Sequence, residues 1–366
     1  MLRQYKLKDY RFSLILWVVA LAVVGIMVIG SAQSSFQQRQ IWGLCIGLGM
    51  MVLLSFIDYT WLLNFYWLFY VIGNALLVAV LFIGENVNGA TRWIRIGIQF
   101  QPSDVVKIIL ILFFAKFFSK YEEKLNTLKI IFLSLLLAGI PLLLIYKEPD
   151  LSTTIVTALT FCAIIFIAGL SYKIIGGILV VAVPIVVVLF SIILQPGQTL
   201  FQNYQLKRIL AWLKPSEYVA ESYQQTNSII AIGSGQLYGK GLNNNMVSSV
   251  KNGNFIAEPQ TDFIFAVAGE ELGFLGCCLI AILELLIALE CIRIGRRAKD
   301  LAGTLICCGM GTLIMFQSFL NICVDTGLMP NTGITLPFVS YGVTSLISFC
   351  IGIGIVLNVG LQTRKY

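Results

Sequence analysis

The chain has 366 residues and a formal net charge of +7. Hydrophobic residues make up 58% of it and charged residues only 12%, a composition that excludes an ordinary soluble domain and is typical of polytopic membrane proteins. Histidine is absent, which excludes Ser-His-Asp and Cys-His catalysis and the H-E-x-x-H zinc motif. The nine cysteines lie in or beside apolar segments without C-x-x-C spacing, so we interpret them as buried hydrophobic residues.

Membrane-spanning helices need about 20 mostly apolar residues, and segments that come near this length recur along the whole chain. The sequence therefore predicts an all-α polytopic membrane protein with about ten transmembrane helices. Their expected apolar cores are Ser13 to Ile29, Ile41 to Ile57, Trp61 to Ile83, Val105 to Phe118, Ile130 to Tyr146, Thr153 to Leu170, Ile174 to Leu194, Phe263 to Ile292, Leu301 to Val324 and Ile334 to Val359.

Lysine and arginine in short loops indicate orientation, because such loops are kept on the cytoplasmic side. With the N-terminus inside, fifteen basic residues fall in inner segments and four in short outer loops. This distribution predicts that both termini are cytoplasmic and that a large outer loop, about 195–262, joins the seventh and eighth spans. We attribute the net charge to topology and to anionic lipid, and we expect no nucleic-acid partner.

The large outer loop contains two distinct stretches. Residues 201–214 mix aromatic, aliphatic and basic side chains and predict an amphipathic helix that lies in the membrane interface. Residues 227–244 are rich in glycine, but their spacing fits neither G-x-G-x-x-G nor the P-loop. We therefore expect no nucleotide site, and no haem or zinc.

Charged residues gather at the outer ends of the predicted spans. Asp262 begins the eighth span from outside and is the best candidate for solvent-facing chemistry, whereas Glu270 and Glu271 lie deeper and are interpreted as structural. Lys107 and Asp104 form either a local salt bridge or, with Arg92 and Arg95, part of a socket for an anion. The other members of this outer group are Lys147, Glu148, Asp150 and Glu258.

Six segments carry a family resemblance. They are "NGATRWIRIGIQFQPSDVVK" (88–107), "EPDLSTT" (148–154), "NYQLKRILAWLKP" (203–215), "AIGSGQLYGKGL" (231–242), "EPQTDFIFAVAGEELGFLG" (258–276) and "MPNTGITLPFVSYG" (329–342). In this order and spacing the chain resembles the SEDS family, the RodA/FtsW type of cell-wall polymerase, over nearly its whole length. The stretch "NYQLKR" favours the RodA type, which serves elongation and cell shape, over the FtsW type.

The resemblance implies an inverting glycosyltransferase that polymerises lipid II at the outer face of the bacterial cytoplasmic membrane. Asp262 would be the general base, and undecaprenyl pyrophosphate would leave. Cations at the same depth would stabilise the leaving group, and a divalent cation, Mg²⁺ or Mn²⁺, is left open. The candidate cations are Arg92, Lys107, Lys147 and Arg208, and the supporting cavity residues are Asp104, Asp150, Glu258 and Ser340. The implied partners are lipid II, undecaprenyl-linked glycan, membrane lipid and a class B penicillin-binding protein.

The chain departs from the family pattern near this site. Asp104 stands where glutamate is usual, Glu148 where glutamine is usual and Ser152 where glycine is usual, and Asn331 and Val343 also differ. Three alternatives stay open: a flippase or transporter of lipid-linked precursors, a scaffold that only recruits a partner, and a division or sporulation paralogue. Charge clustered at the outer rim favours surface chemistry over a transport path.

Overall fold

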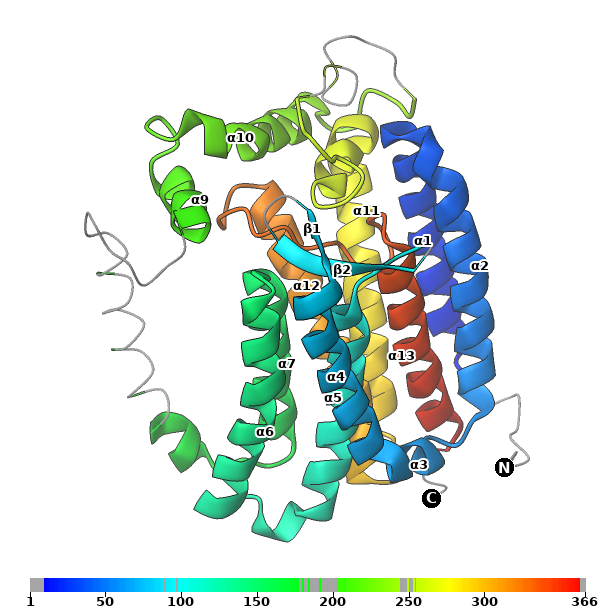
Figure 1. The fold of residues 1–366 in the computed structure, drawn as a ribbon. Helices are drawn as coiled ribbons and strands as arrows, with labels where there is room; N and C mark the ends of the chain where they lie inside the picture. Colours follow the sequence, from blue (N-terminus) through cyan, green and yellow to red (C-terminus); the bar gives the residue numbers. More distant parts are fainter. Residues whose placement is uncertain are drawn as a thin grey trace.

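The computed structural model describes residues 10–362, except 88–89, 97, 178–179, 181–183, 185–190, 192–202, 244–248, 250–252 and 254. These residues form an elongated helical bundle with a smaller group of elements at one end (Figure 1). The expected seventh span, 174–194, lies largely outside the described residues. Each of the other expected spans overlaps a helix, so the polytopic helical fold is confirmed, although the number of ten spans is not.

The helices are named here in chain order, with the numbering of Figure 1. They are α1 (Phe12–Ala32), α2 (Ser34–Phe56), α3 (Tyr59–Leu62), α4 (Tyr66–Ile83), α5 (Pro102–Lys120), α6 (Leu128–Lys147), α7 (Leu151–Ile167), α9 (Asn203–Leu213), α10 (Val219–Ser234), α11 (Ile264–Gly295), α12 (Leu301–Asp325) and α13 (Val343–Leu361). Among the described residues, seven helical segments are long and apolar enough to cross a membrane. A further apolar helix, α7, has 17 residues.

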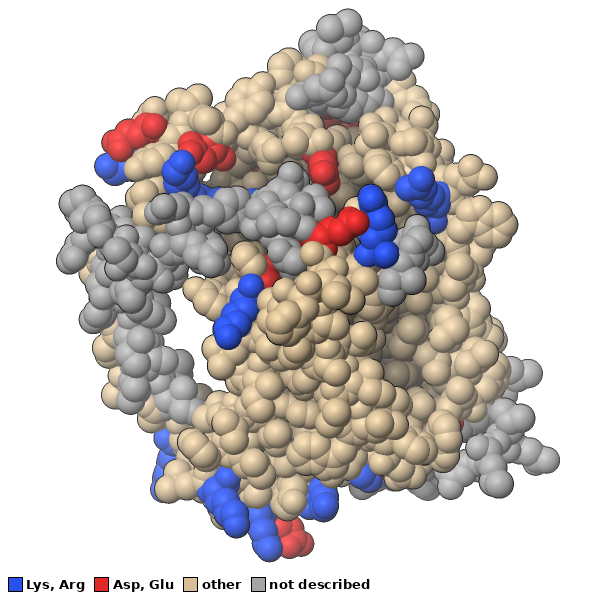
Figure 2. Space-filling model, in the orientation of Figure 1, with Lys and Arg blue, Asp and Glu red and all other residues tan. Residues whose placement is uncertain are grey.

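Charged side chains occupy the two ends of the molecule and leave an uncharged band between them (Figure 2). Such a band is the surface expected for contact with hydrocarbon. The start of α1 meets the ends of α11 and α13, because Arg11 Nη1 lies 3.9 Å from Glu290 Oε1 and close to Gly360. The bundle therefore has one end with α3, the start of α1 and the end of α13, and an opposite end with α9, α10 and a small sheet (Figure 1).

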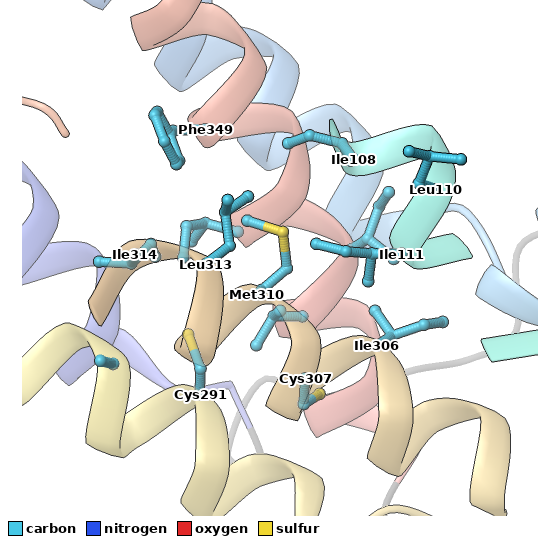
Figure 3. Close-up of a cluster of buried hydrophobic side chains, with 14 of the residues drawn as sticks. Ile108, Leu110, Ile111, Cys291, Ile306, Cys307, Met310, Leu313, Ile314 and Phe349 are labelled. Carbon is cyan, nitrogen blue, oxygen red and sulfur yellow. The ribbon is translucent and has the colours of Figure 1, made fainter. Parts of the chain in front are cut away.

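The centre of the bundle is α12, which packs against α5, α7, α11 and α13. Figure 3 shows Met310 of α12 surrounded by apolar side chains from α5, α11 and α13. Gly352 of α13 lets this methionine fit, because an added Cβ there would lie 2.3 Å from Met310 Cε. Close packing of this kind keeps α12 rigid, so that it supports the elements at one end of the bundle.

A three-stranded antiparallel sheet follows α4, in the order β1 (Glu85–Val87), β2 (Ala90–Ile96), β3 (Ile98–Phe100). These strands were not predicted from the sequence. The signal was available, because Ile94, Ile96, Ile98 and Phe100 recur at every second position. The sheet places Arg92 on its middle strand, at the end of the bundle with α9 and α10.

Helix α11 is broken at Gly273, whose φ of 68° and ψ of −167° are not helical. The glycine-rich segment of the outer loop crosses α11 at this break. Lys240 N donates to Glu270 O at 2.9 Å, and Gly241 N donates to Glu271 O at 3.0 Å. An added Cβ at Gly239 would lie 2.1 Å from Glu271 O, so only glycine permits this approach. The segment therefore serves as a backbone clamp on a broken helix.

Glu270 and Glu271 are structural, as the sequence analysis expected. Glu270 Oε1 lies 2.7 Å from Lys240 Nζ, and Glu271 Oε1 accepts a hydrogen bond of 2.6 Å from Ser31 on α1. Both side chains are buried, so each carboxylate joins an outer-loop or neighbouring-helix group to α11.

The tenth span begins later than expected. The predicted start of its apolar core at Ile334 is wrong, because residues 331–342 are irregular and α13 starts at Val343. Ile334, Leu336, Phe338 and Val339 are buried without being helical. Hydropathy measures only how apolar a segment is. It cannot show that the backbone of this segment is held in a non-helical conformation by side chains from other helices.

Candidate active site

Asp262 lies in the turn that precedes α11, at the end of the bundle with α9, α10 and the sheet. Its backbone is held firmly, since Asn321 Nδ2 of α12 donates to Asp262 O at 2.8 Å and Ser340 Oγ donates to the neighbouring Thr261 O at 2.7 Å. No hydrogen bond from the described residues reaches its half-buried carboxylate. The chain thus fixes the position of Asp262 and leaves its acid group available.

The irregular segment 331–335 runs beside Asp262 and is clamped through its carbonyl groups. Each of four carbonyls accepts a hydrogen bond from a side chain, and the four donors lie on three helices. The pairs are Arg208 Nη1 to Asn331 O at 3.2 Å, Ser152 Oγ to Thr332 O at 2.5 Å, Asn321 Nδ2 to Ile334 O at 2.8 Å and Gln317 Nε2 to Thr335 O at 2.9 Å. Helices α7, α9 and α12 therefore set the shape of this segment together.

Gly333 lies close to both the carboxylate of Asp262 and the guanidinium of Arg208. Its φ is +70°, and an added Cβ would lie 3.2 Å from Asp262 Oδ2 and 3.8 Å from Arg208 Nη1. A side chain at this position would cover the carboxylate and strain the backbone. Glycine thus keeps the acid uncovered while the guanidinium of Arg208, from the outer-loop helix α9, approaches it.

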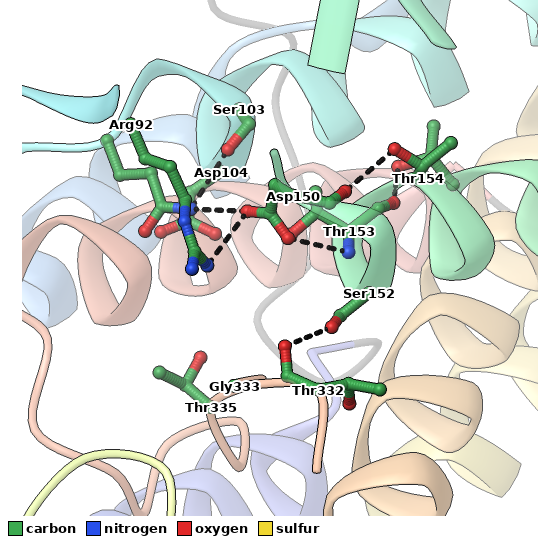
Figure 4. A network of polar contacts seen from close by, with 12 residues as sticks. Arg92, Ser103, Asp104, Asp150, Ser152, Thr153, Thr154, Thr332, Gly333 and Thr335 are labelled. Carbon is green, nitrogen blue, oxygen red and sulfur yellow. Dashed lines mark hydrogen bonds and ion pairs between the residues drawn. The ribbon is translucent and has the colours of Figure 1, made fainter. Parts of the chain in front are cut away.

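Arg92 and Asp150 form the second part of the site (Figure 4). Arg92 Nη1 lies 3.5 Å from Asp150 Oδ2, and both side chains are largely buried. Asp150 also caps α7, accepting a hydrogen bond of 3.1 Å from Thr153 N. Because Asp150 is fixed by the helix terminus, it holds the arginine of β2 in one position.

Charge interactions connect Asp262 with the Arg92–Asp150 pair. Burial raises the pKa of Asp262 above its ordinary value, Arg92 and then Arg208 oppose this, and Glu258 and Asp150 add to it. A partly desolvated carboxylate with a raised pKa is a better proton acceptor than an ordinary surface aspartate. Two arginines nearby can stabilise an anion, so the arrangement suits removal of a proton beside a developing negative charge.

The other predicted site residues are placed differently. Lys107 is buried, and its Nζ lies 2.9 Å from both Asp104 Oδ1 and Gln317 Oε1. The predicted local salt bridge is therefore present, and it is linked through Gln317 to Thr335 of the clamped segment.

Three basic or acidic candidates lie at the surface. Lys147 is exposed, and no polar contact among the described residues connects it to Arg92 or Asp262. Arg95 is exposed and pairs with Glu85, 3.6 Å away, so it does not join Lys107 and Arg92 in one socket. Glu258 is exposed, yet its charge reaches Asp262.

Residues that hold the site were missed by the sequence analysis. Gln317 and Asn321 of α12, together with Ser152 of α7, donate the hydrogen bonds that shape segment 331–335. Their signal was weak but present, because Gln317 and Asn321 are polar residues four positions apart in an otherwise apolar span. Such a pair lies on one helix face and predicts a polar neighbour.

The described residues do not supply an obvious metal site. They contain no group of three or more acidic or cysteine side chains placed to hold a metal ion. The acids near Asp262 are instead interleaved with Arg92 and Arg208. We therefore derive no step through a metal, and the dependence on Mg²⁺ or Mn²⁺ stays an open prediction.

Comparison with known families identifies the architecture. The model of the FtsW, RodA and SpoVE family, described as cell cycle proteins, matches residues 7–365. The chain belongs to this family. Similar relatives include the probable peptidoglycan glycosyltransferase FtsW of Geobacter sulfurreducens, 32% identical over 98% of this chain and 97% of the relative. Another is the peptidoglycan glycosyltransferase MrdB of Escherichia coli, 34% identical over 95% of this chain and 92% of the relative.

Solved structures of the family share the fold. A chain from a study of polymerization and crosslinking by a peptidoglycan synthase complex has a TM-score of 0.79 and 27% identity, over 96% of this chain and 97% of that chain. The rod shape determining protein RodA of Thermus thermophilus has a TM-score of 0.70 and 26% identity, over 98% of each chain. The membership that the six segments indicated is therefore confirmed, and the fold extends over the whole chain.

Proposed function

We propose that the protein is a peptidoglycan glycosyltransferase that polymerises lipid II into glycan strands. Its full-length relatives carry this activity in their names, and the TM-score of 0.79 was obtained with a chain of a peptidoglycan synthase complex. The single observation that carries the mechanism is the uncovered carboxylate of Asp262, placed by Gly333 next to Arg208 and within the field of Arg92.

The chemistry follows from this arrangement. Asp262 takes the proton from the acceptor hydroxyl of one lipid-linked sugar as that oxygen attacks the anomeric carbon of the next. The bond from that carbon to the pyrophosphate breaks, and attack from the opposite side inverts the configuration. The departing undecaprenyl pyrophosphate gains negative charge, which Arg92 and Arg208 stabilise. Lys107 contributes through Asp104 and Gln317, which support the walls of the site.

The setting suits substrates with a lipid tail. Asp262 lies at the end of the bundle that carries α9 and α10, opposite α3, and we assign this end to the outer face of the cytoplasmic membrane. Helix α9 has its Trp212 Nε1 hydrogen-bonded to Gly327 O at 2.9 Å, and we propose that it lies in the interface. A class B penicillin-binding protein is the proposed partner, because polymerised glycan must be crosslinked.

The main alternative is a flippase for lipid-linked precursors. A transport path would need polar surface through the bundle. Among the described residues, however, the cavity below Lys107, between α5, α6, α7 and α12, is mostly lined by apolar side chains. Surface chemistry is therefore the better account.

Purified protein in liposomes, supplied with lipid II, separates the two functions. We expect glycan polymer on a denaturing gel, sensitive to a muramidase, and no movement of fluorescent lipid II between leaflets. Translocation without polymer would contradict the proposal. Glu217→Gln, an exposed acid paired with Lys214 on the outer loop, is the matched control and should polymerise normally.

A further inference from the structure

Gln40 is a buried amide on α2, a helix that contributes no residue to the site described above. Its side chain is 1% exposed, and both ends of the amide are bonded to the connection between α12 and α13. Gln40 Nε2 donates to Ser340 O at 3.1 Å, and Gln40 Oε1 accepts a hydrogen bond of 3.2 Å from Gly342 N. A primary amide carries a donor and an acceptor, so this one side chain holds two backbone groups of residues 340–342 at once.

Residues 340–342, which Gln40 holds, are in turn bonded to the turn that precedes α11. Ser340 Oγ donates to Thr261 O at 2.7 Å. Tyr341 N donates to the carbonyl one residue earlier, Gln260 O, at 2.8 Å. Both accepting carbonyls directly precede the proposed catalytic base in the chain. A continuous path of measured hydrogen bonds therefore runs from α2 to the backbone beside that base.

The backbone just before Ser340 adopts a conformation that depends on its neighbours. Phe338 has a φ of +59°, which residues other than glycine rarely adopt and which persists only where the surroundings enforce it. Ser340 Oγ accepts a hydrogen bond of 2.7 Å from Leu336 N and so closes this turn. Gly25 of α1 also packs against the turn, since an added Cβ there would lie 2.7 Å from Val339 Cα. Contacts from α1 and α2 thus help to enforce this backbone.

We propose that Gln40 is a positioning residue for glycosyl transfer: it holds Ser340 and thereby fixes the backbone of Asp262, so that the carboxylate stays within reach of the acceptor hydroxyl. This inference rests on the proposed function, in which Asp262 is the base. Gln40 touches no reacting atom and acts only through residues 340–342. Because a displacement of about 1 Å can reduce a catalytic rate about a hundredfold, loss of this contact lowers kcat more than it changes KM.

Two variants of Gln40 and one control test the proposal. Gln40→Met keeps an unbranched side chain of similar length and removes both the donor and the acceptor. Gln40→Glu keeps an acceptor for Gly342 N and loses the donor to Ser340 O. Gln38 is exposed on the same helix, so Gln38→Met makes the same chemical change away from the connection. Thermal melting of each purified protein verifies folding, and every measurement is also made on Gln40→Glu, which decides the proposal where the Met variant does not fold.

The first measurement is the rate of lipid II polymerisation in liposomes, separated into kcat and KM, at a temperature well below the lowest Tm. We expect kcat of Gln40→Met to fall by about 10- to 100-fold with a smaller change in KM. Gln40→Glu should also lose kcat, because it lacks the donor to Ser340 O. Gln38→Met should match the parent. A folded Gln40→Met variant with the kcat of the parent would overturn the proposal, because Gln40 would then serve stability alone.

A double-mutant cycle tests whether Gln40 acts through Ser340. Ser340→Ala breaks the bond to Thr261 O and leaves the side chain of Gln40 in place. If both residues belong to one path, the double variant Gln40→Met/Ser340→Ala is about as slow as the slower single variant, because contacting residues on one network are coupled. Losses of kcat that multiply fully would contradict a path through Ser340.

Hydrogen exchange resolved at single amides separates this inference from the proposed function, because it needs no substrate. The amide of Tyr341 reports directly on its bond to Gln260 O. We expect this amide to exchange about tenfold faster in Gln40→Met than in the parent or in Gln38→Met, as for the loss of one supporting hydrogen bond. Faster exchange at Gly342 alone would overturn the proposal, since Gln40 would then hold only its direct partner. If the parent makes no polymer, the proposed function fails, and the exchange at Tyr341 still decides whether Gln40 holds this turn.

Discussion

Side chains of neighbouring residues hold the backbone at Asp262 through hydrogen bonds. The carboxylate of Asp262, by contrast, accepts no hydrogen bond from the described residues. The consequence is that nearby charges, and not a fixed hydrogen bond, tune its proton affinity. Arg92 and Arg208 lower its pKa, whereas burial, Glu258 and Asp150 raise it. A base must be deprotonated to act, so activity is lost as the pH falls through the pKa of Asp262.

The acidic limb of the pH–activity profile is the range in which activity falls at low pH. Removing a positive charge and removing a negative charge near Asp262 should shift this limb in opposite directions. Arg208→Gln removes an opposing cation, raises the pKa of Asp262 and shifts the limb to higher pH. Glu258→Gln removes a repelling anion and shifts the limb to lower pH. The pH dependence of kcat/KM on lipid II reports both shifts, and a common direction for the two variants would refute the assignment of Asp262 as the titrating base.

Gly333 should tolerate no side chain. In Gly333→Ala the new Cβ approaches Asp262 Oδ2 to 3.2 Å at a φ of +70°, so we expect polymerisation to fall at least tenfold with a stability cost of about 1–2 kcal/mol. Gly342→Ala, in the same connection, is the control, because its φ of 166° suits any residue and its Cβ meets only Ser345 at 3.5 Å. Normal activity of Gly333→Ala would show that the carboxylate is reached from another side.

At the scale of elements, the sequence predicted the helices well and the irregular backbone poorly. Spans are visible because each helix satisfies its own backbone groups, and hydropathy alone locates it. Segment 331–335 depends instead on donors from α12 and from α7 and α9, the last two of which lie far away in the sequence. Asp262 could be found from its depth in the bundle, whereas the roles of Ser152, Gln317 and Asn321 required the packed structure.

The glycine-rich segment and the broken helix α11 should be mechanically coupled. Gly239→Ala places a Cβ 2.1 Å from Glu271 O, which must separate the clamp from the helix, so we expect a clearly lower Tm and reduced polymerisation. Gly233→Ala, six residues earlier, meets nothing within 4 Å and should leave both unchanged. Similar melting temperatures for the two variants would mean that the clamp does not stabilise α11.

At the scale of the whole molecule, the orientation in the membrane is a separate prediction. An impermeant maleimide applied to right-side-out spheroplasts should label Glu217→Cys on the outer loop. It should label Glu123→Cys, in the connection between α5 and α6, only after permeabilisation. The parent provides the background from the nine native cysteines. Labelling of Glu123→Cys alone in intact spheroplasts would invert the topology and move Asp262 to the cytoplasmic side.

The fold assembles the site from segments spread over most of the chain. Arg92 comes from the sheet, Asp150 from α7, Arg208 from the outer loop and Asp262 from the start of α11. No one of these segments could perform the chemistry by itself, and the common depth of their charged residues was the feature that the sequence could show.

The most direct test of this account is the rate of lipid II polymerisation by purified Asp262→Asn in liposomes, with thermal melting to verify that the variant is folded. The amide has nearly the same shape as the carboxylate but cannot accept the proton, so we predict a decrease of about 10²–10⁴-fold in kcat with little change in Tm. A folded Asp262→Asn variant that polymerises lipid II at the rate of the parent would contradict the central claim.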